Sequence, residues 1–161
     1  MALVLIVCVG LTLVLFPGDV WLGPMETTHI AARVLLLTLI ALGALRALKR
    51  PRTERAWLAV FIAIMPIVYV RGALRLGSAS SLAVELVGQA IFVALALGGV
   101  YLSPWLFAIG LLGHGLGWDL WHRHGSLVAA WYPVACTAVD VGLGLYAALM
   151  TAEFQRLRRD R

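Results

Sequence analysis

Long apolar runs alternate along the chain with short segments rich in proline, glycine and charged residues. A helix needs about 20 residues to cross the hydrocarbon core of a bilayer, and each run has roughly this length. The pattern predicts six membrane-spanning helices, at approximately 2–21, 29–48, 56–76, 81–102, 104–122 and 130–153. Five helices are the alternative, because only a short turn at Pro104 separates the fourth run from the fifth. One unbroken helix over both runs would nevertheless be far too long for a single crossing.

The composition supports a membrane protein. The 161 residues are 62% apolar and 13% charged, with a mean hydropathy of +0.94, whereas soluble domains average about 45–50% apolar and about 25% charged. These values exclude a soluble globular domain and a disordered chain, and the 13 basic residues are too scattered among apolar runs for a nucleic-acid-binding face. The predicted fold class is therefore all-α, with one integral membrane domain, 1–161, built as a bundle of transmembrane helices.

The basic residues predict the orientation of this bundle. They concentrate between the second and third predicted spans and in the C-terminal tail: Arg46, Lys49, Arg50, Arg52 and Arg55, then Arg156, Arg158, Arg159 and Arg161. Basic loops remain in the cytoplasm, and an even number of spans separates the two clusters, so both termini are predicted to be cytoplasmic. The near absence of lysine points to a bacterial genome of high GC content, and hence to a bacterial inner membrane.

Polar side chains within the predicted spans gather in the half of the bundle that faces away from the cytoplasm. They are His29 and Arg33 in the second span, Tyr69 and Arg71 in the third, Glu85 and Gln89 in the fourth, His114, Trp118, Asp119 and His122 in the fifth, and Cys136 and Asp140 in the sixth. Ionisable groups at this depth are costly unless they meet a partner or serve a function. We therefore expect one site in the outer, periplasmic half, a buried ion pair between Arg71 and Glu85, and a kink at Pro66.

These residues support two kinds of chemistry. Acid–base catalysis would use the ionisable members, which are His114, Asp119, His122, Asp140 and Glu85. A desolvated carboxyl group donates a proton that an imidazole or a second carboxylate can remove. The remaining side chains would bind the substrate: Trp118, Tyr69, Arg71, Gln89, His29 and Arg33.

The second kind of chemistry uses a metal. His114, His122 and Asp119 would hold zinc or iron, because both ions accept imidazole together with carboxylate. Plain α-helical geometry separates His114 from His122 by about 80° around the helix axis, so this ligand set requires the fifth span to bend or to end early.

The stretch His-Gly-Leu-Gly-Trp-Asp-Leu-Trp-His over 114–122, followed by Pro133, Cys136 and Asp140, resembles a pattern in small uncharacterised integral membrane proteins of bacteria. Those proteins carry a His, a Trp-Asp pair and a second His on one helix, then Pro, Cys and Asp on the next. A Glu in their preceding helix matches Glu85. The resemblance covers the C-terminal half of the chain, and it implies that these residues form one constellation without implying an activity.

The expected function is that of an integral membrane enzyme. It would act on a lipid or another hydrophobic small molecule by acid–base or metal-assisted chemistry such as cyclisation, isomerisation or hydrolysis. Two alternatives stay open. A small proton-coupled transporter would need His and acidic residues at the same depth and would require a homodimer, and a non-catalytic membrane partner subunit would use them only as structural contacts. Membrane lipid is the expected partner, and nucleic acid is not.

Overall fold

The computed structural model describes residues 51–159 and six separate helical positions before them, which are His29, Ala32, Leu36, Ile40, Gly43 and Arg46. The described residues form helices and connecting turns, with no β-strand among them. The predicted span 2–21, the rest of the predicted span 29–48, the predicted site residue Arg33 and both chain ends lie outside the described residues.

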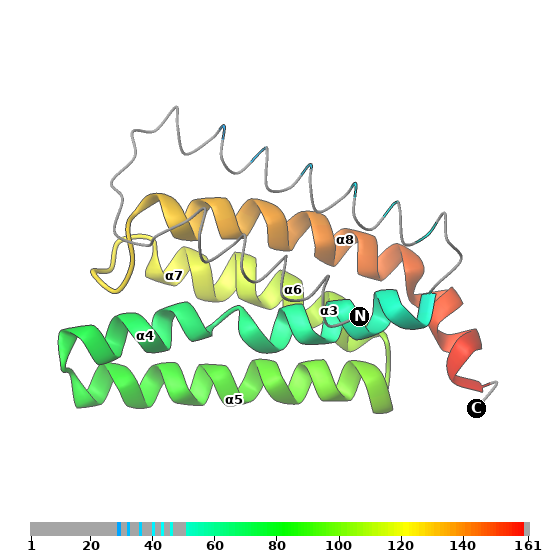
Figure 1. The fold of residues 1–161 in the computed structure, drawn as a ribbon, viewed down its shortest axis with the longest axis horizontal. Helices are drawn as coiled ribbons and strands as arrows, with labels where there is room; N and C mark the ends of the chain where they lie inside the picture. Colours follow the sequence, from blue (N-terminus) through cyan, green and yellow to red (C-terminus); the bar gives the residue numbers. More distant parts are fainter. Residues whose placement is uncertain are drawn as a thin grey trace.

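α3 (Pro51–Ile64) and α4 (Ile67–Leu76) form one rod that is interrupted at Pro66 (Figure 1). Proline has no N–H to donate and its ring displaces the preceding turn, so a helix breaks there. The predicted kink is therefore confirmed at its predicted position. α4 ends at Gly77, whose φ of 65° is a left-handed conformation that glycine adopts without strain, and the Gly77 N–H caps the carbonyl of Leu74.

α5 (Ala79–Tyr101) starts directly after this turn and runs back along the first rod (Figure 1). The hydroxyl of Ser78 accepts a hydrogen bond from the backbone N–H of Ser81 and so caps the first turn of the helix. A short turn at Pro104 then reverses the chain again. This turn confirms the predicted boundary between the fourth and fifth apolar runs, since α5 ends before it and a new helix begins after it.

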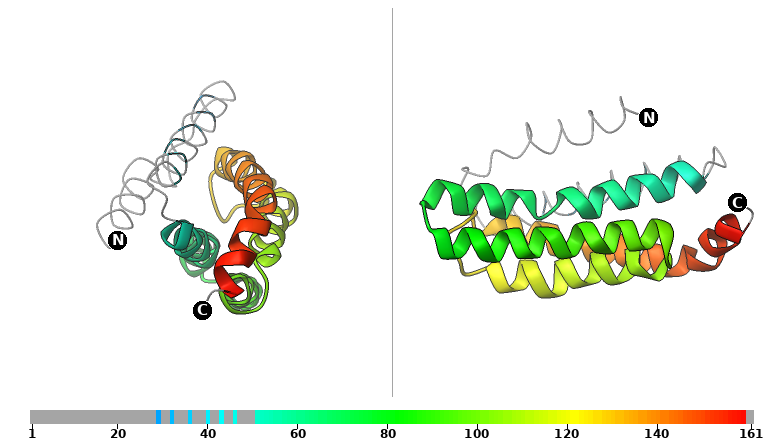
Figure 2. Two further views of the ribbon diagram at one scale, coloured as in Figure 1. Left: turned by 90° about the vertical axis from the view of Figure 1, so that its right-hand side faces the viewer. Right: turned by 90° about the horizontal axis from the view of Figure 1, so that it is seen from below.

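Three helical segments follow Pro104 without interruption and form the next rod. They are α6 (Trp105–Gly113), the π-helix η1 (His114–Asp119) and α7 (Leu120–His122). The last rod is α8 (Trp131–Arg159), which lies alongside α6 and η1. Seen along their axes, the rods pack side by side in one bundle (Figure 2).

Three of these helices are long and apolar enough to cross a membrane: Arg52–Leu76, Ala79–Tyr101 and Trp131–Arg156. They correspond to the third, fourth and sixth predicted spans. The fifth predicted span coincides with the rod that η1 interrupts. Large apolar side chains such as Leu97 and Leu149 point outward from the bundle, where hydrocarbon rather than water is the favourable surrounding. The described chain is thus all-helical and consistent with a membrane protein, while a total of six spans stays a prediction.

The arrangement of the connections agrees with a simple topology. The turn at Gly77 and the loop 123–130 lie at one end of the bundle, and the turn at Pro104 and the end of α8 lie at the other (Figure 1).

The predicted orientation, with the basic tail in the cytoplasm, can be tested with reporter fusions. A reporter that works only in the cytoplasm should be active when fused after Arg161, and a reporter that works only outside the cytoplasm should be active when inserted at the exposed Gly125. Activity and alkylation assays on the two fusions measure this directly. An external C-terminus would reverse the predicted orientation.

Candidate functional site

The candidate site begins with the π-helix η1. In an α-helix, residues five positions apart point about 140° away from each other, whereas in a π-helix the i→i+5 pattern brings them to the same face one turn apart. His114 and Asp119 are the first and last residues of η1. The wide turn therefore places the imidazole and the carboxylate on one side of the rod, which regular α-helical geometry would not do.

Close packing against α8 fixes η1 in place. Gly115 approaches α8 so closely that a Cβ there would lie 2.8 Å from the Cβ of Asp140. The Thr137 hydroxyl lies 3.0 Å from the Gly115 carbonyl and 2.9 Å from the Pro133 carbonyl, so that it can donate to either. A glycine is required at position 115 because any side chain would push the two helices apart.

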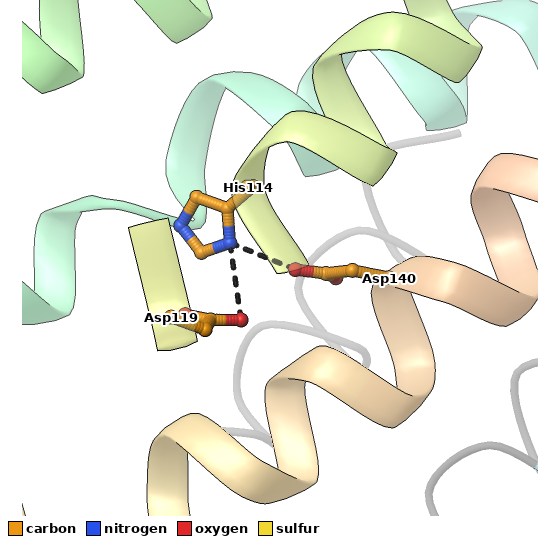
Figure 3. A group of neighbouring side chains, drawn as sticks. All are labelled: His114, Asp119 and Asp140. Atoms are coloured by element: carbon orange, nitrogen blue, oxygen red, sulfur yellow. Dashed lines mark hydrogen bonds and ion pairs between the residues drawn. The ribbon is translucent and has the colours of Figure 1, made fainter. Parts of the chain in front are cut away.

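His114, Asp119 and Asp140 form what we call the central cluster (Figure 3). Nδ1 of His114 lies 2.7 Å from Oδ2 of Asp140 and 3.4 Å from Oδ2 of Asp119. The hydroxyl of Tyr69 on α4 donates a hydrogen bond of 2.6 Å to Oδ1 of Asp119. All three members are at most 1% exposed, so the cluster is a set of ionisable groups enclosed between three rods of the bundle.

Glu85 and His122 form a second buried group, the Glu85–His122 pair. Nε2 of His122 lies 2.9 Å from Oε1 of Glu85, and Nδ1 of His122 lies 2.8 Å from the carbonyl oxygen of Trp118. A carbonyl only accepts, so Nδ1 carries a proton. The hydrogen bond at Nε2 needs a further proton, which sits either on the imidazole or on the carboxyl group. The pair therefore holds one proton that two groups share.

Aromatic rings connect the two groups. The Tyr69 ring lies 4.4 Å from the His122 ring and 6.1 Å from the His114 ring, measured between centroids. The Phe92 ring packs edge-on against His114 at 4.9 Å. Trp118 contacts both Phe92 and His122, and its ring occupies the space that a Cβ at Gly88 would need. The polar groups are thus surrounded by apolar surface, which strengthens every charge–charge interaction among them.

Several buried polar atoms at the site have no hydrogen-bond partner in the described part of the chain. These atoms are Nε2 of His114, Oδ2 of Asp119, Oδ1 of Asp140, Oε2 of Glu85 and Nε1 of Trp118. Such atoms are rare in folded proteins because burying them without a partner costs free energy. A concentration of them at one place indicates that a ligand, a substrate or an ion completes the site.

The structure brings together seven of the residues singled out from the sequence: Tyr69, Glu85, His114, Trp118, Asp119, His122 and Asp140. Of the predicted catalytic and substrate-binding residues, it does not bring in the other three that it describes. Arg71 and His29 are exposed, and Gln89 donates its side-chain N–H to the carbonyl of Ala63 at 2.5 Å.

The expected Arg71–Glu85 ion pair is wrong, because Glu85 is paired with His122. The side chains close enough together to hold one metal ion are His114, Asp119 and Asp140, so Asp140 replaces His122 in the ligand set that was expected from the sequence.

Two contributors to the site were missed by the sequence analysis. Phe92 lies seven residues after Glu85 and Thr137 lies three residues before Asp140, so each shares a helical face with a residue that was selected. A search along those faces would have found both. Neither residue carries a charge, so neither was selected as an ionisable group within an apolar helix.

A separate polar group lies towards the other end of the bundle. Arg46 pairs with Glu54 and Glu153, and the Tyr146 hydroxyl donates to the fully buried Glu54. These contacts join α3 to α8. They fasten the bundle at the end that the basic residues assign to the cytoplasm.

The depth of the site follows from helix geometry. At 1.5 Å per residue, Glu85 lies about 9 Å from the start of α5 and Asp140 about 14 Å from the start of α8. Both helices start at the end of the bundle that carries the loop 123–130 (Figure 1). The site therefore occupies the half of the bundle nearer to that loop.

These features define a class: an all-helical protein with membrane-length apolar helices and an enclosed site of two histidines and three carboxyl groups. No family model, no curated protein and no solved structure matches the chain. The resemblance to small bacterial membrane proteins stays a prediction, and the function has to be argued from the site itself.

Proposed function

We propose that the protein is an intramembrane enzyme that performs acid–base chemistry on a lipid or another hydrophobic small molecule. The observation that carries the proposal is the presence of two buried histidine–carboxylate pairs, His114–Asp140 and His122–Glu85, both in contact with Tyr69. Isomerisation, cyclisation and hydrolysis each need one group that removes a proton and another that supplies one. Two pairs in one enclosed site meet that requirement.

The central cluster is the proton-accepting side. Asp140 receives the hydrogen bond from Nδ1 of His114, which fixes the imidazole tautomer and leaves Nε2 as a basic nitrogen. That Nε2 atom is buried and has no partner among the described residues. An oriented imidazole with one free nitrogen is the arrangement that a general base requires.

The Glu85–His122 pair is the proton-donating side. The proton between Nε2 of His122 and Oε1 of Glu85 is the one that the pair can supply to a substrate. The other carboxyl oxygen, Oε2 of Glu85, is buried without a partner in the described part of the chain, so a substrate group can contact the pair there.

The surroundings of the site favour a hydrophobic substrate. The Trp121 ring lies 4.8 Å from the His122 ring, and Trp121 itself is 61% exposed on the outer surface of the bundle. Trp118 and Tyr69 continue this aromatic lining inward. A molecule that approaches from the bilayer thus meets aromatic side chains first and titratable groups behind them.

A lipid-conversion assay tests the proposal. Wild-type protein and His114→Gln protein are reconstituted into vesicles of bacterial lipid extract, and the contents are compared by untargeted mass spectrometry. A species should disappear and another appear only with the wild-type protein. His124→Gln is the matched control, because His124 is exposed in the loop after α7 and should leave the conversion unchanged.

The same vesicles test proton-coupled transport, which the linked series of buried titratable groups also supports. A pH-sensitive dye trapped inside reports proton movement when a gradient is imposed. Proton flux that depends on His114, together with unchanged lipid composition, would favour the transporter and reject the enzyme.

A further inference from the structure

We propose that the central cluster binds one divalent transition-metal ion through His114, Asp119 and Asp140, and that Zn²⁺ is the ion best suited to it. Charge is the first reason. Both carboxylates face the same imidazole nitrogen, and a single imidazolium can balance only one of them. A buried carboxylate without a counter-charge is strongly unfavourable. A divalent ion with two carboxylates and a neutral histidine gives a net charge of zero.

Geometry is the second reason. The ligand atoms of the three side chains all lie within 4.8 Å of one another. Zinc ligands at 2.0–2.2 Å from the ion stand about 3.3 Å apart in a tetrahedral site. The separation of 3.4 Å between Nδ1 of His114 and Oδ2 of Asp119 meets this value. The separation of 2.7 Å between Nδ1 and Asp140 is that of a hydrogen bond, and it needs to widen by only about half an ångström once an ion replaces the proton.

The atoms around the cluster supply the third reason. Oδ2 of Asp119 and Oδ1 of Asp140 are buried without a hydrogen-bond partner in the described structure. Tyr69 donates to the other oxygen of Asp119, which is the kind of outer hydrogen bond that orients a ligating carboxylate. Glycine at position 115 and the Thr137 hydroxyl hold the π-helix in the geometry that faces Asp119 towards His114.

This ligand set differs from the one expected from the sequence. His122 does not belong to it, because both of its ring nitrogens are engaged by Glu85 and by the Trp118 carbonyl. Three protein ligands leave a fourth position open, as in zinc sites that activate water or polarise a carbonyl oxygen. Nδ1 of His114 cannot bind the ion and donate to Asp140 at once, so in the zinc-loaded chain the imidazole proton would sit on Nε2, and the base would be a water at the open position rather than Nε2. This role of the ion rests on the proposed function, whereas its binding does not.

Metal analysis of the purified full chain tests the inference. The protein is loaded with Zn²⁺ in detergent, dialysed, and measured by inductively coupled plasma mass spectrometry. Wild-type protein should retain about one zinc per chain, and Asp119→Asn, Asp140→Asn and His114→Gln should each weaken zinc affinity by at least about tenfold. His122→Gln and His124→Gln should retain zinc as the wild type does. Loss of zinc in His122→Gln protein that still elutes as the folded species in size-exclusion chromatography would support the sequence-based ligand set and overturn ours.

X-ray absorption of the zinc-loaded wild-type protein provides a measurement that does not depend on the folding of variants. It should show nitrogen and oxygen ligands at about 2.0–2.1 Å and no sulfur. Zinc that washes out of the wild-type protein, or a sulfur ligand, would overturn the inference. Lipid conversion by zinc-free protein would reject a catalytic role for the ion and keep the enzyme, while retained zinc without lipid conversion would reject the enzyme and keep the metal site.

Discussion

Asp140→Asn should lower the rate of the catalysed reaction by about 10³–10⁴-fold, because an amide can neither fix the His114 tautomer nor stabilise its protonated form. The fold should survive, since Asn has nearly the same volume as Asp and removes a buried charge rather than a packing contact. Initial rates in vesicles, on the product found in the lipid comparison, provide the measurement. Size-exclusion profiles in detergent show whether the variant is folded.

Glu153→Gln is the matched control for this variant. It makes the same change from carboxyl to amide on the same helix, but Glu153 lies at the far end of α8 and pairs with Arg46. Its rate should stay within a factor of about two of the wild type. Asp140→Asn protein that keeps more than a tenth of the wild-type rate would remove Asp140 from the reaction.

Glu85→Ala and His122→Ala should each lower the free energy of unfolding by about 3–5 kcal/mol, because each change leaves the other member of a buried pair without its partner. The double variant should lose less than the sum, by about 1–3 kcal/mol. Denaturant unfolding in mixed micelles, followed by tryptophan fluorescence, measures the free energy of unfolding of the wild type, the two single variants and the double variant.

Arg71→Ala distinguishes the observed Glu85–His122 pair from the Arg71–Glu85 pair that the sequence analysis expected. Arg71 is exposed, so its removal should have little effect on stability. The observed pairing would be contradicted if the losses in free energy of unfolding for Glu85→Ala and His122→Ala were additive. A loss for Arg71→Ala as large as that for Glu85→Ala would contradict it as well.

The sequence carries most of the information about the helices. Apolar run length predicted spans at 56–76, 81–102 and 130–153, and the structure has helices at Arg52–Leu76, Ala79–Tyr101 and Trp131–Arg159, because length and hydropathy are properties of each run alone. The residues expected to converge from the fifth and sixth spans, His114 and Asp140, are in contact. Their depth along each helix could be counted from residue numbers.

Partner choice was not predictable in the same way. Arginine is the strongest counter-charge for a buried glutamate, but the long side chain of Arg71 on α4 extends outward, and the rigid imidazole of His122 reaches Glu85 instead. Whether a side chain reaches a given partner depends on how its helix is rotated about its own axis. The hydrophobic period of one sequence does not fix that rotation to within the width of a side chain. The sequence analysis placed His114 and Asp119 in one site, but it did not predict the π-helix that brings them together, because its angular estimate assumed regular α-helical turns.

The wide turn of η1 also explains how one extra residue fits into the rod without turning the rest of it. Five positions in a π-helix cover the same single turn as four positions in an α-helix, so His114 and Asp119 share a face. Removing one glycine, such as Gly117, would leave a regular α-helix in which the imidazole and the carboxylate stand four positions apart and still share that face. In evolutionary terms the wide turn is a single-codon insertion that the helix absorbs locally, so a relative one residue shorter would carry the same pair of residues at a different spacing.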